Sequence, residues 1–506
     1  MKKSVGKVYL VGAGPGDPGL ITLKGKHCLQ QADVVLYDAL VNSRLLEWVR
    51  HDAEKVFVGK RGGEVSISQQ KIERLMIRYA QQGKKVVRFK GGDPYLFGRG
   101  AEEVETLKKK KIPFEVVPGV TSVLAAPCYA GIPLTHRHYS SSIAIVTGHE
   151  DPAKLQPSLR WKELAKGVDT LVCLMSVVQL DKIVRELLKA GKNPKTPTAL
   201  IEWGTTFHQK TVVGHLGNIV ERAKEKKIEP PAVLVVGEVI KLRKHLNWFE
   251  KKPLFGKRIL VTRAQHQIPE FRVLLEEQGA SMIELPMIAI RPLRLNEFRQ
   301  KIEKASYDWV IFTSTNGVEQ FLNRLRELEM DIRVLKKARL CAIGPKTGDR
   351  LKAAHLRVDL VPEREFRAEG ILQVFNRWGS VLDKKILLIR AEEGRDVLPD
   401  GLRDLGAEVE QISIYHTEPV KHPTSVVRQV KKELSQGKIH AVTFTSPSSV
   451  NSFVRSFGKE ILKKTKVASL GPVTSAALKE AGVKVQIEAS PYTIEELTEA
   501  LVRGLD

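Results

Sequence analysis

The segment Val87–Gly100 combines accessible backbone with a single carboxylate, which suits it to holding a small ligand. It reads VRFKGGDPYLFGRG, so glycines stand on both sides of one aspartate, Asp93. The apolar residues Val86, Val87 and Phe89 indicate the end of a buried strand. Glycine allows close approach and positive φ angles, and open α/β folds bind ligands at the carboxyl edge of the sheet. We therefore predict a ligand-binding loop. The alternative is a tight connection between two elements that binds no ligand.

A second loop, near the start of the chain, narrows the chemistry of that ligand. The apolar strand Lys7–Val11 is followed by GAGPGDPG at residues 12–19. The dinucleotide-binding pattern GxGxxG requires a glycine where this chain has Asp17. Pro15 and Pro18 stiffen the loop and remove N–H donors that a phosphate would need. A ligand without phosphates, such as an adenosyl group, is therefore favoured over a pyrophosphate.

The elements that position these loops belong to more than one domain, since 506 residues are too many for a single core. Residues 241–258 form a charged connector with a proline and a glycine, and an apolar strand begins directly after it. We place the main boundary near residue 250. This gives two domains, at residues 1–250 and 251–506.

The second half contains an internal repeat. RILVTRA at 258–264 resembles KILLIRA at 385–391, IFTSTNGV at 311–318 resembles TFTSPSSV at 443–450, and AIGPKT at 342–347 resembles SLGPVT at 469–474. Three matches in the same order indicate a duplicated α/β unit with two similar lobes. Because strands alternate with helical stretches, we expect a parallel, doubly wound sheet in each lobe. The lobes span roughly 256–287 with 415–506, and 288–414.

Hydroxyl residues in the repeated segments are placed to begin helices. A hydroxyl at the N-cap accepts a hydrogen bond from a backbone N–H, and helix starts attract anions. Capping alone would explain each residue, but several such helix starts facing a space between two lobes would bind a polycarboxylate. The residues are Thr313, Ser314, Thr445, Ser446 and Thr474.

The net charge of +24 favours an anionic partner. The basic residues are dispersed among acidic ones, and no nucleic-acid-binding motif stands out. No run of 18 apolar residues predicts a membrane helix, no signal peptide is recognisable, and the four cysteines lack metal or disulfide spacing. We expect a cytoplasmic protein that acts on a polycarboxylate, without a metal, nucleic acid or membrane partner. A basic nucleic-acid-binding regulator is the alternative from another class.

The motifs of the first half, taken in order, resemble those of the uroporphyrinogen-III C-methyltransferases in the tetrapyrrole methylase family. They are residues 11–19, Tyr37–Leu40, Val58–Arg61, Val87–Gly100, Val117–Ser122 and Gly131–Arg137. The resemblance spans about residues 5–250. It implies two subdomains, with S-adenosylmethionine (SAM) bound between them, and a homodimer formed through this half.

The same resemblance implies roles for individual residues. Asp38 would be a proton acceptor and Lys60 a proton donor, although a turn-forming aspartate and a surface lysine would look the same. Arg61, His136 and Arg137 would bind substrate carboxylates, which a guanidinium holds bidentately. The implied cofactor contacts are Pro15, Gly91, Gly92, Asp93, Leu96, Thr121, Ser122, Met175 and Gly204. The segment Leu174-Met175-Ser176 departs from the family's aromatic-Met-Gly pattern.

The second half resembles the uroporphyrinogen-III synthases. The resemblance rests on the two-lobed repeat, on Thr313-Ser314-x-Asn316-Gly317 and on Tyr415. It implies that linear hydroxymethylbilane is closed into a ring, with inversion of its last pyrrole and without a cofactor. Tyr415, after the strand Gln411–Ile414, would assist the departing hydroxyl, although a half-buried tyrosine at a strand end is equally consistent. The hydroxyl residues of the repeat would hold acetate and propionate groups.

Both resemblances together predict a bifunctional enzyme. The second half would make uroporphyrinogen III, and the first half would methylate it twice with SAM to precorrin-2. The nearer alternative is another tetrapyrrole or diphthine methylase with a non-catalytic second half.

Overall fold

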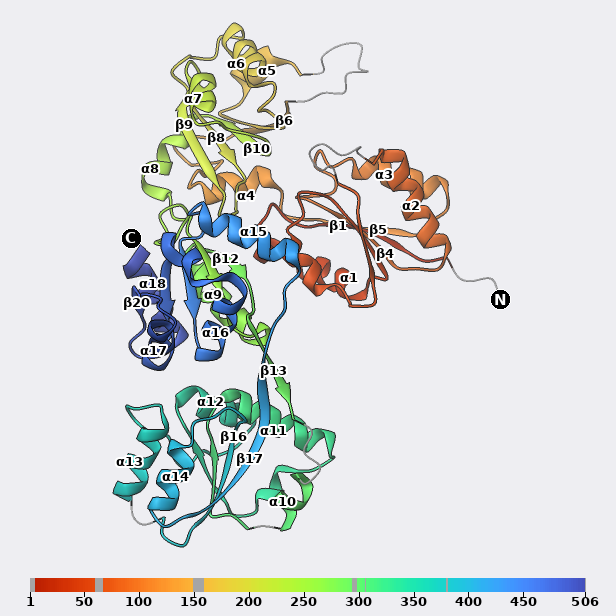
Figure 1. Cartoon of the computed structure of the whole chain (residues 1–506). Helices are drawn as coiled ribbons and strands as arrows, with labels where there is room; N and C mark the ends of the chain where they lie inside the picture. The colour runs from red at the N-terminus through yellow and green to blue at the C-terminus, as the bar shows by residue number, and fades with distance from the viewer. Residues whose placement is uncertain are drawn as a thin grey trace. The chain divides into compact units, whose positions relative to one another are not determined.

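The chain forms two compact units. The computed structural model describes residues 5–59, 67–148, 159–293, 298–304, 306–378 and 381–505. Unit 1 comprises Met1–Lys257 with Gln278–Ser281, and unit 2 comprises Arg258–Glu277 with Met282–Asp506 (Figure 1). Within the described ranges, no helix has the length and apolar character needed to cross a membrane.

The first subdomain of unit 1 is a parallel sheet with apolar cores on both faces. Its strand order is β3-β2-β4-β1-β5. The strands are β1 (Val8–Gly12), β2 (Val34–Tyr37), β3 (Glu54–Phe57), β4 (Val86–Lys90) and β5 (Phe114–Val117). The helices are α1 (Leu23–Gln31), α2 (Gln69–Gln81) and α3 (Gly100–Lys109). Alternate residues of β1 enter different cores, with Leu10 on one face and Val11 on the other. Because all the pairings in this sheet are parallel, the carboxyl ends of its strands meet at one edge.

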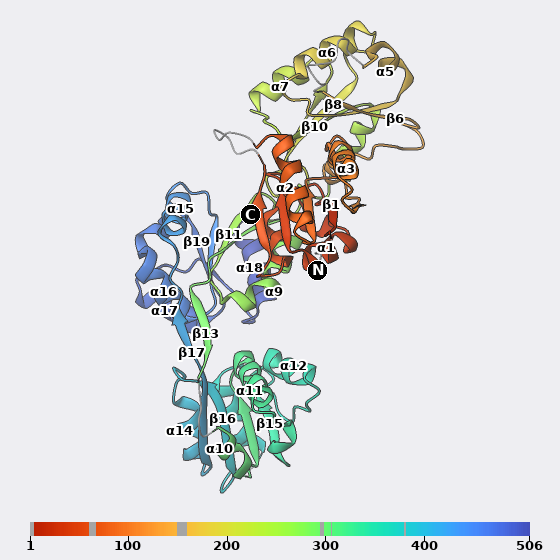
Figure 2. The same cartoon turned by 90° about the vertical axis from the view of Figure 1, so that its right-hand side faces the viewer.

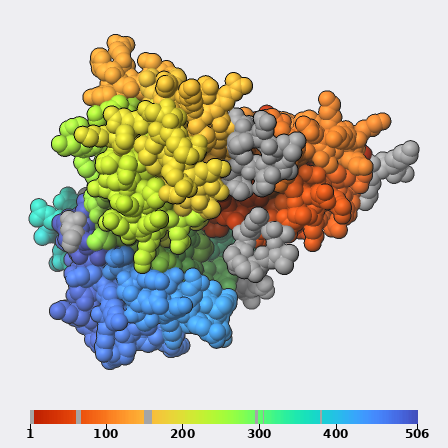
Figure 3. Space-filling model, turned by 90° about the horizontal axis from the view of Figure 1, so that it is seen from above, coloured from red at the N-terminus to blue at the C-terminus, as the bar shows by residue number. Residues whose placement is uncertain are grey.

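The second subdomain of unit 1 is a mixed sheet of order β6-β7-β10-β8-β9. Only β6 and β7 are parallel, while β10 and β9 run antiparallel to their neighbours. The strands are β6 (Ile143–Thr147), β7 (Thr170–Leu174), β8 (Pro197–Glu202), β9 (Lys210–His215) and β10 (Ala232–Val236). The helices are α4 (Ser122–Tyr129), α5 (Trp161–Gly167), α6 (Leu180–Lys189), α7 (Ile219–Glu225) and α8 (Arg243–Leu246). In the space-filling view the yellow surface belongs to this subdomain, and the orange to red surface on the right belongs to the first subdomain (Figure 3).

Unit 2 contains two further sheets, which define its lobes. Lobe A has the strand order β12-β11-β18-β19-β20, and lobe B has the order β13-β17-β16-β14-β15. The strands of lobe A are β11 (Arg258–Val261), β12 (Ser281–Glu284), β18 (Ala441–Phe444), β19 (Lys466–Ser469) and β20 (Ile487–Glu488). Those of lobe B are β13 (Ile288–Pro292), β14 (Trp309–Phe312), β15 (Arg339–Ala342), β16 (Lys385–Ala391) and β17 (Glu408–Pro419).

The helices of unit 2 follow the same division. Lobe A carries α9 (Ile268–Glu277), α15 (Thr424–Ser435), α16 (Pro447–Phe457), α17 (Pro472–Glu480) and α18 (Ile494–Leu505). Lobe B carries α10 (Phe298–Lys304), α11 (Thr315–Glu327), α12 (Pro345–Ala353), α13 (Ala368–Trp378) and α14 (Val397–Asp404).

Each lobe is assembled from both copies of the sequence repeat. In lobe A, β11 from the first copy pairs in parallel with β18 from the second. In lobe B, β14 from the first copy pairs in parallel with β16 from the second. The repeated segments thus occupy equivalent central strands, but every lobe needs residues from both copies.

The chain passes between the lobes along β13 and β17, which lie side by side in two perpendicular views (Figures 1 and 2). The two strands are antiparallel, with Ile290 opposite Thr417, whereas β17 is parallel to β16. The expected parallel sheet of lobe B therefore has one antiparallel edge, because the chain enters the lobe on one of these strands and leaves it on the other.

Candidate functional site

Three loops meet at the carboxyl edge of the first sheet, and glycine allows them to touch. The loop after β1 and the loop after β4 form a backbone bridge, in which the Gly92 N–H donates to the Gly14 carbonyl at 2.7 Å. A Cβ on Gly12 would lie 2.6 Å from the Gly92 carbonyl oxygen. A Cβ on Gly119, in the loop after β5, would lie 2.7 Å from the Gly12 Cα. Both distances are far inside van der Waals contact, so the three loops form one close-packed backbone surface.

Asp93 organises this surface through both of its carboxylate oxygens. Oδ1 accepts hydrogen bonds from the backbone N–H groups of Tyr95, at 2.8 Å, and Leu96, at 3.1 Å. Oδ2 accepts one from the N–H of Gly119 at 3.0 Å. Asp93 is therefore a turn-forming residue that also ties two loops together. Oδ1 already accepts two hydrogen bonds, whereas Oδ2 accepts one and keeps a lone pair for another donor. Contact with a cofactor stays a prediction.

The second subdomain reaches this edge through α4 and the loop after β8. Thr121 is the N-cap of α4 and accepts from the Val123 N–H at 3.3 Å. Asp17, in the first loop, donates its N–H to Thr205 Oγ1 at 3.1 Å and accepts at Oδ2 from the Tyr129 hydroxyl at 2.6 Å. Burial and Asp17 together raise the pKa of Tyr129. These bonds hold the proline-containing loop against the second subdomain.

Left-handed backbone marks the loops after β7 and β8. Met175 has φ 52° and a side chain that is 48% exposed, while Trp203 and Thr205 have φ 46° and 71°. Such values are uncommon for residues other than glycine and are often found at functional sites. Between the last two, Gly204 packs so tightly that a Cβ would lie 2.9 Å from the Cα of Ala126.

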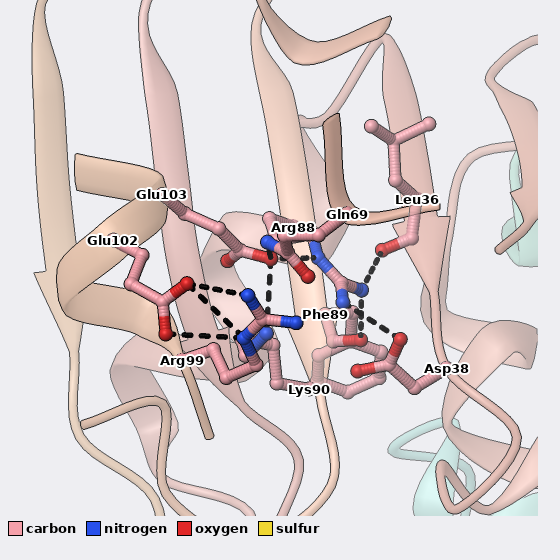
Figure 4. Close-up of polar contacts among 9 residues, drawn as sticks. All are labelled: Leu36, Asp38, Gln69, Arg88, Phe89, Lys90, Arg99, Glu102 and Glu103. Carbon is pink, nitrogen blue, oxygen red and sulfur yellow. Dashed lines mark hydrogen bonds and ion pairs between the residues drawn. The ribbon is translucent and has the colours of Figure 1, made fainter. Parts of the chain in front are cut away.

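A buried ion cluster lies behind Asp38 (Figure 4). Arg88, on β4, donates from Nη2 to Asp38 Oδ1 at 2.7 Å and from Nε to Glu103 Oε1 at 3.1 Å. Lys90 Nζ and Gln69 Nε2 donate to the same Glu103 oxygen, at 3.1 and 3.0 Å. Arg88 and Glu103 are only 2% and 0% exposed, whereas Asp38 is half-buried. The cluster therefore joins the sheet interior to a carboxylate that reaches the surface.

The charges of this cluster balance, with two acids and two bases. Burial lowers the pKa of Arg88, but Asp38 and Glu103 outweigh it and leave that pKa raised. Burial, and then the nearby Arg88, lower the pKa of Lys90. Removing one partner of a buried pair leaves an uncompensated charge, which costs about 3–5 kcal/mol. Moving these residues would cost free energy, so they fix the position of the Asp38 carboxylate.

In unit 2, the hydroxyl of Tyr415 lies 3.0 Å from Ser314 Oγ. Ser314 is the N-cap of α11 and accepts from the Gly317 N–H at 2.9 Å. Tyr415 is 6% exposed, and burial raises its pKa although Ser314 and Asn316 act in the opposite direction. The Tyr415 hydroxyl therefore keeps its proton at neutral pH and lies at the start of a helix.

The same helix start touches lobe A. Asn316 Oδ1 lies 3.0 Å from His266 Nε2 and 3.1 Å from Gln267 Nε2. A second contact joins the lobes at α12, where Lys346 Nζ lies 3.0 Å from both Glu270 and Glu495. Tyr415 lies 3.0 Å from Ser314, which is two residues before Asn316. The residue expected to assist the departing hydroxyl therefore lies beside the contact between the lobes.

Capping in unit 2 differs from the expectation at the Gly-Pro-x-Thr segments. Ser446 is an N-cap and accepts from the Ser449 N–H at 3.2 Å, in parallel with Ser314. Thr474, however, lies inside the first turn of α17, whose N-cap is Gly471 without a side-chain hydrogen bond. Gly344 caps α12 in the same way. These helices begin at a Gly-Pro step, and their first N–H groups receive no side-chain cap.

Comparison with known proteins relates both units to tetrapyrrole chemistry. Residues 7–220 match the family model of the Tetrapyrrole (Corrin/Porphyrin) Methylases, and residues 269–499 match that of Uroporphyrinogen-III synthase HemD. A relative from Ruminiclostridium josui, the "porphyrin biosynthesis protein HemD", is 36% identical over 499 residues and covers 98% of each chain. This chain belongs to both families. The predicted fusion and the α/β class of its two halves are confirmed.

Other proteins match the methylase half alone. The uroporphyrinogen-III C-methyltransferase of Priestia megaterium is 53% identical over 236 residues, which are 47% of this chain and 99% of that protein. A solved structure of the Thermus thermophilus uroporphyrin-III C-methyl transferase, complexed with S-adenyl homocysteine, is 44% identical. It covers 47% of this chain and 100% of its own, with a TM-score of 0.40.

Within the methylase half, the structure brings most of the predicted cofactor residues to one region. Pro15, Gly91, Gly92 and Asp93 lie in loops at the carboxyl edge of the first sheet, and Thr121 and Ser122 begin α4. Leu96 packs against the apolar core of the second subdomain, so its side chain serves packing whether or not it also contacts a cofactor. Met175 and Gly204 follow β7 and β8.

The predicted substrate residues of this half are less completely placed. Lys60 and Arg61 lie outside the described residues. His136 is half-buried in a turn, where its Nδ1 accepts from the His138 N–H at 3.2 Å, and Arg137 is exposed. Sequence reasoning missed Gly119, Arg88 and Glu103. A basic residue between apolar strand residues, at Arg88, was the available signal for the buried cluster.

Proposed function

We infer that this chain is a bifunctional enzyme of tetrapyrrole biosynthesis, with uroporphyrinogen-III synthase and SAM-dependent uroporphyrinogen-III C-methyltransferase activities. The observation that carries this conclusion is the match of two family models to separate segments of one chain. A relative that spans 98% of the chain supports the same pairing. We assign methylation to residues 1–250 and ring closure to residues 251–506.

The residues at the edge of the first sheet fit SAM. The loop with Pro15 and Pro18 lacks two of the N–H donors that a phosphate would use, and SAM carries no phosphate. Oδ2 of Asp93 retains a lone pair for an ammonium or hydroxyl group, and the glycine-lined backbone allows close approach. When bound, SAM supplies an electrophilic methyl group to a carbon of the macrocycle.

This chain contributes positioning and proton transfer to methylation. Attack of a carbon on a sulfonium depends mainly on alignment, which two subdomains tied through Asp17 and Tyr129 can supply. The methylated macrocycle must then lose a proton. Asp38 accepts it at Oδ2, because Arg88 engages Oδ1. Lys60 is the proposed proton donor. Arg61, His136 and Arg137 are proposed to hold substrate carboxylates.

Ring closure needs only the residues of unit 2. The Tyr415 hydroxyl gives its proton to the departing hydroxyl of hydroxymethylbilane, which leaves as water, and the proton released when the ring closes restores the tyrosine. The resulting cationic chain end is stabilised by its own pyrrole, and the last pyrrole is inverted as the ring forms. Ser314, 3.0 Å away, orients the Tyr415 hydroxyl. Thr313, Thr445, Ser446 and Thr474 lie near helix starts, where backbone N–H groups attract acetate and propionate groups.

The assay supplies hydroxymethylbilane with and without SAM and separates the products by chromatography. We expect uroporphyrinogen III without SAM and precorrin-2 with it. Appearance of the type I isomer alone would contradict the synthase assignment. Failure to methylate added uroporphyrinogen III would contradict the methyltransferase assignment, because that substrate bypasses unit 2.

We also propose a cytoplasmic homodimer formed through unit 1, without nucleic-acid or membrane partners. The edge strand β6 supports this proposal, since Ile143 and Ile145 are both exposed on it, and exposed apolar side chains often mark an interface. Sedimentation of the full chain and of an Ile143→Lys/Ile145→Lys variant tests it. We expect a dimer for the first and a monomer for the second, whereas a monomeric parent chain would contradict the proposal.

A further inference from the structure

One arginine of the internal repeat occurs in both lobes of unit 2. Arg263 follows β11 in lobe A, and Arg390 is the penultimate residue of β16 in lobe B. They occupy the same place in the matching segments RILVTRA and KILLIRA. Each therefore stands at the carboxyl end of an equivalent strand, so one lobe serves as an internal comparison for the other.

In lobe B the arginine is held by its own lobe. Arg390 is buried, and its Nη1 donates to Gln411 Oε1 at 2.8 Å and to Asp396 Oδ1 at 3.1 Å. Its Nε donates to the Ala391 carbonyl at 3.3 Å. Every part of this pattern is structural, since the guanidinium joins β16 to β17 and to the start of α14.

In lobe A the same side chain has lost these partners. Arg263 Nε and Nη1 are buried, and neither donates to an acceptor in the described part of the chain. At the spacing that relates Gly279 to Gly406, the counterparts of Asp396 and Gln411 are Pro269 and Glu284. The proline has no acceptor in its side chain.

The remaining counterpart is engaged elsewhere. Glu284 forms an ion pair with Arg272 and accepts from Gln265 Nε2 at 3.3 Å. The carboxylates near Arg263 are Glu270 and Glu495, and both form ion pairs with Lys346 of lobe B at 3.0 Å. Burial lowers the pKa of Arg263, and these two carboxylates offset that effect only in part.

A buried charged donor without an acceptor is costly, and native structures rarely keep one without a use. Because hydrogen bonds from a guanidinium to a carboxylate are short and strong, each unpaired N–H group of Arg263 suits that ligand. Arg263 also lies at the carboxyl edge of the lobe A sheet, where α16 and α17 begin. Open α/β sheets bind their ligands at this edge.

We infer that Arg263 binds a carboxylate of the linear tetrapyrrole substrate, as a binding residue of lobe A that its lobe B counterpart does not provide. This inference rests on the proposed synthase function. It predicts that Arg263 contributes to substrate affinity at the expense of the stability of the free enzyme, a common trade-off at binding sites.

The test compares Arg263→Gln with Arg390→Gln in the full chain. For Arg263→Gln we expect a KM for hydroxymethylbilane raised roughly ten- to a hundredfold, as loss of a charge-assisted hydrogen bond implies, with an unchanged or higher Tm. Arg263→Lys, which keeps the charge, should recover part of the affinity. For Arg390→Gln we expect a lower Tm, because it breaks contacts within the lobe.

An unchanged KM in Arg263→Gln would overturn the inference. So would a raised KM accompanied by a fall in Tm as large as that of Arg390→Gln, since Arg263 would then be structural. Methylation of added uroporphyrinogen III confirms that unit 1 is intact in each variant. Failure of the proposed function itself is distinguishable, because then the parent chain would yield no type III isomer.

Discussion

The guanidinium of Arg88 lies 2.7 Å from the carboxylate of Asp38 and is held from its other side by Glu103 at 3.1 Å. Arg88 is fully enclosed by the sheet and α3, whereas Asp38 is half-buried at the end of β2. A rigid, buried cation therefore fixes one oxygen of a carboxylate whose other oxygen is available to a substrate. This arrangement suits a residue that must accept a proton in a defined direction.

Replacement of Asp38 should separate catalysis from folding. For Asp38→Asn we expect a fall in methylation kcat of roughly a hundredfold or more, the usual contribution of a general base. The side chain keeps its size and is half-buried, so the loss of its charge should lower Tm less than Arg88→Met does. Steady-state methylation of uroporphyrinogen III and thermal unfolding provide the two measurements. A variant that methylates at the parent rate would remove Asp38 from the mechanism.

Replacement of Arg88 should affect both properties. Arg88→Met leaves Glu103 buried without one of its cations, so we expect unit 1 to lose about 3–5 kcal/mol of stability. Methylation should fall as well, because Asp38 is no longer oriented. Ring closure by unit 2 is the internal control and should persist. Stability equal to that of the parent chain would show that the buried cluster tolerates an unpaired acid.

Gly119 should be as critical as the glycines of the Val87–Gly100 segment. A Cβ there would lie 2.7 Å from the Cα of Gly12, so Gly119→Ala must push two loops apart. We expect SAM binding, measured by calorimetry, to be lost or strongly weakened. The matched control is Gly167→Ala, where a Cβ meets no atom within 4 Å and where binding should be unchanged. Equal affinity in both variants would count against the close-packed surface.

Tyr415→Phe should slow ring closure and leave methylation intact. The change removes only the hydroxyl that lies 3.0 Å from Ser314 Oγ, so the apolar packing of the ring is preserved. We expect the enzymatic rate of uroporphyrinogen III formation to fall roughly tenfold or more, in line with loss of one positioned proton donor. Unchanged closure would exclude Tyr415 as the assisting group.

The pH dependence of closure offers a separate check on Tyr415. A donor works only while it keeps its proton, and burial raises the pKa of Tyr415 above the usual tyrosine value of 10.0. The loss of activity through this group therefore shifts to higher pH. We expect no loss between pH 8 and pH 10 from Tyr415, measured as the initial rate of type III formation. An alkaline fall below pH 10 that disappears in Tyr415→Phe would contradict the direction of the shift.

Sequence patterns located the loops and the repeat because both depend on local residue types. The glycines and prolines of Gly12–Gly19 and Val87–Gly100 indicate loops by residue type alone, independently of the rest of the chain. Asp93 was expected to contact a cofactor, yet its visible role is to hold the N–H groups of Leu96 and Gly119. That role depends on a loop more than twenty residues away, which no local pattern reveals.

Longer-range pairing set the limit of prediction elsewhere too. Arg88 and Lys90 belong to a strand by pattern, and only the packing of α3 on the sheet brings Glu103 to them. The repeat predicted two similar lobes, with residues 256–287 and 415–506 in one of them, but it did not reveal that β13 pairs antiparallel with β17. Both facts depend on which segments meet in space.

The exchange of strands between the two copies has a consequence for how the second half is made. The Thr262 hydroxyl donates to the carbonyl of Thr443, which is 181 positions later in the chain. Lobe B is one continuous segment and can form on the ribosome soon after β17 emerges. Lobe A must instead wait with β11 exposed until β18 and β19 have been synthesised, and such distant pairings are slow to form. Lobe B would therefore act as a folded spacer that brings the two parts of lobe A together, and its early folding would shorten the time during which β11 is open to aggregation.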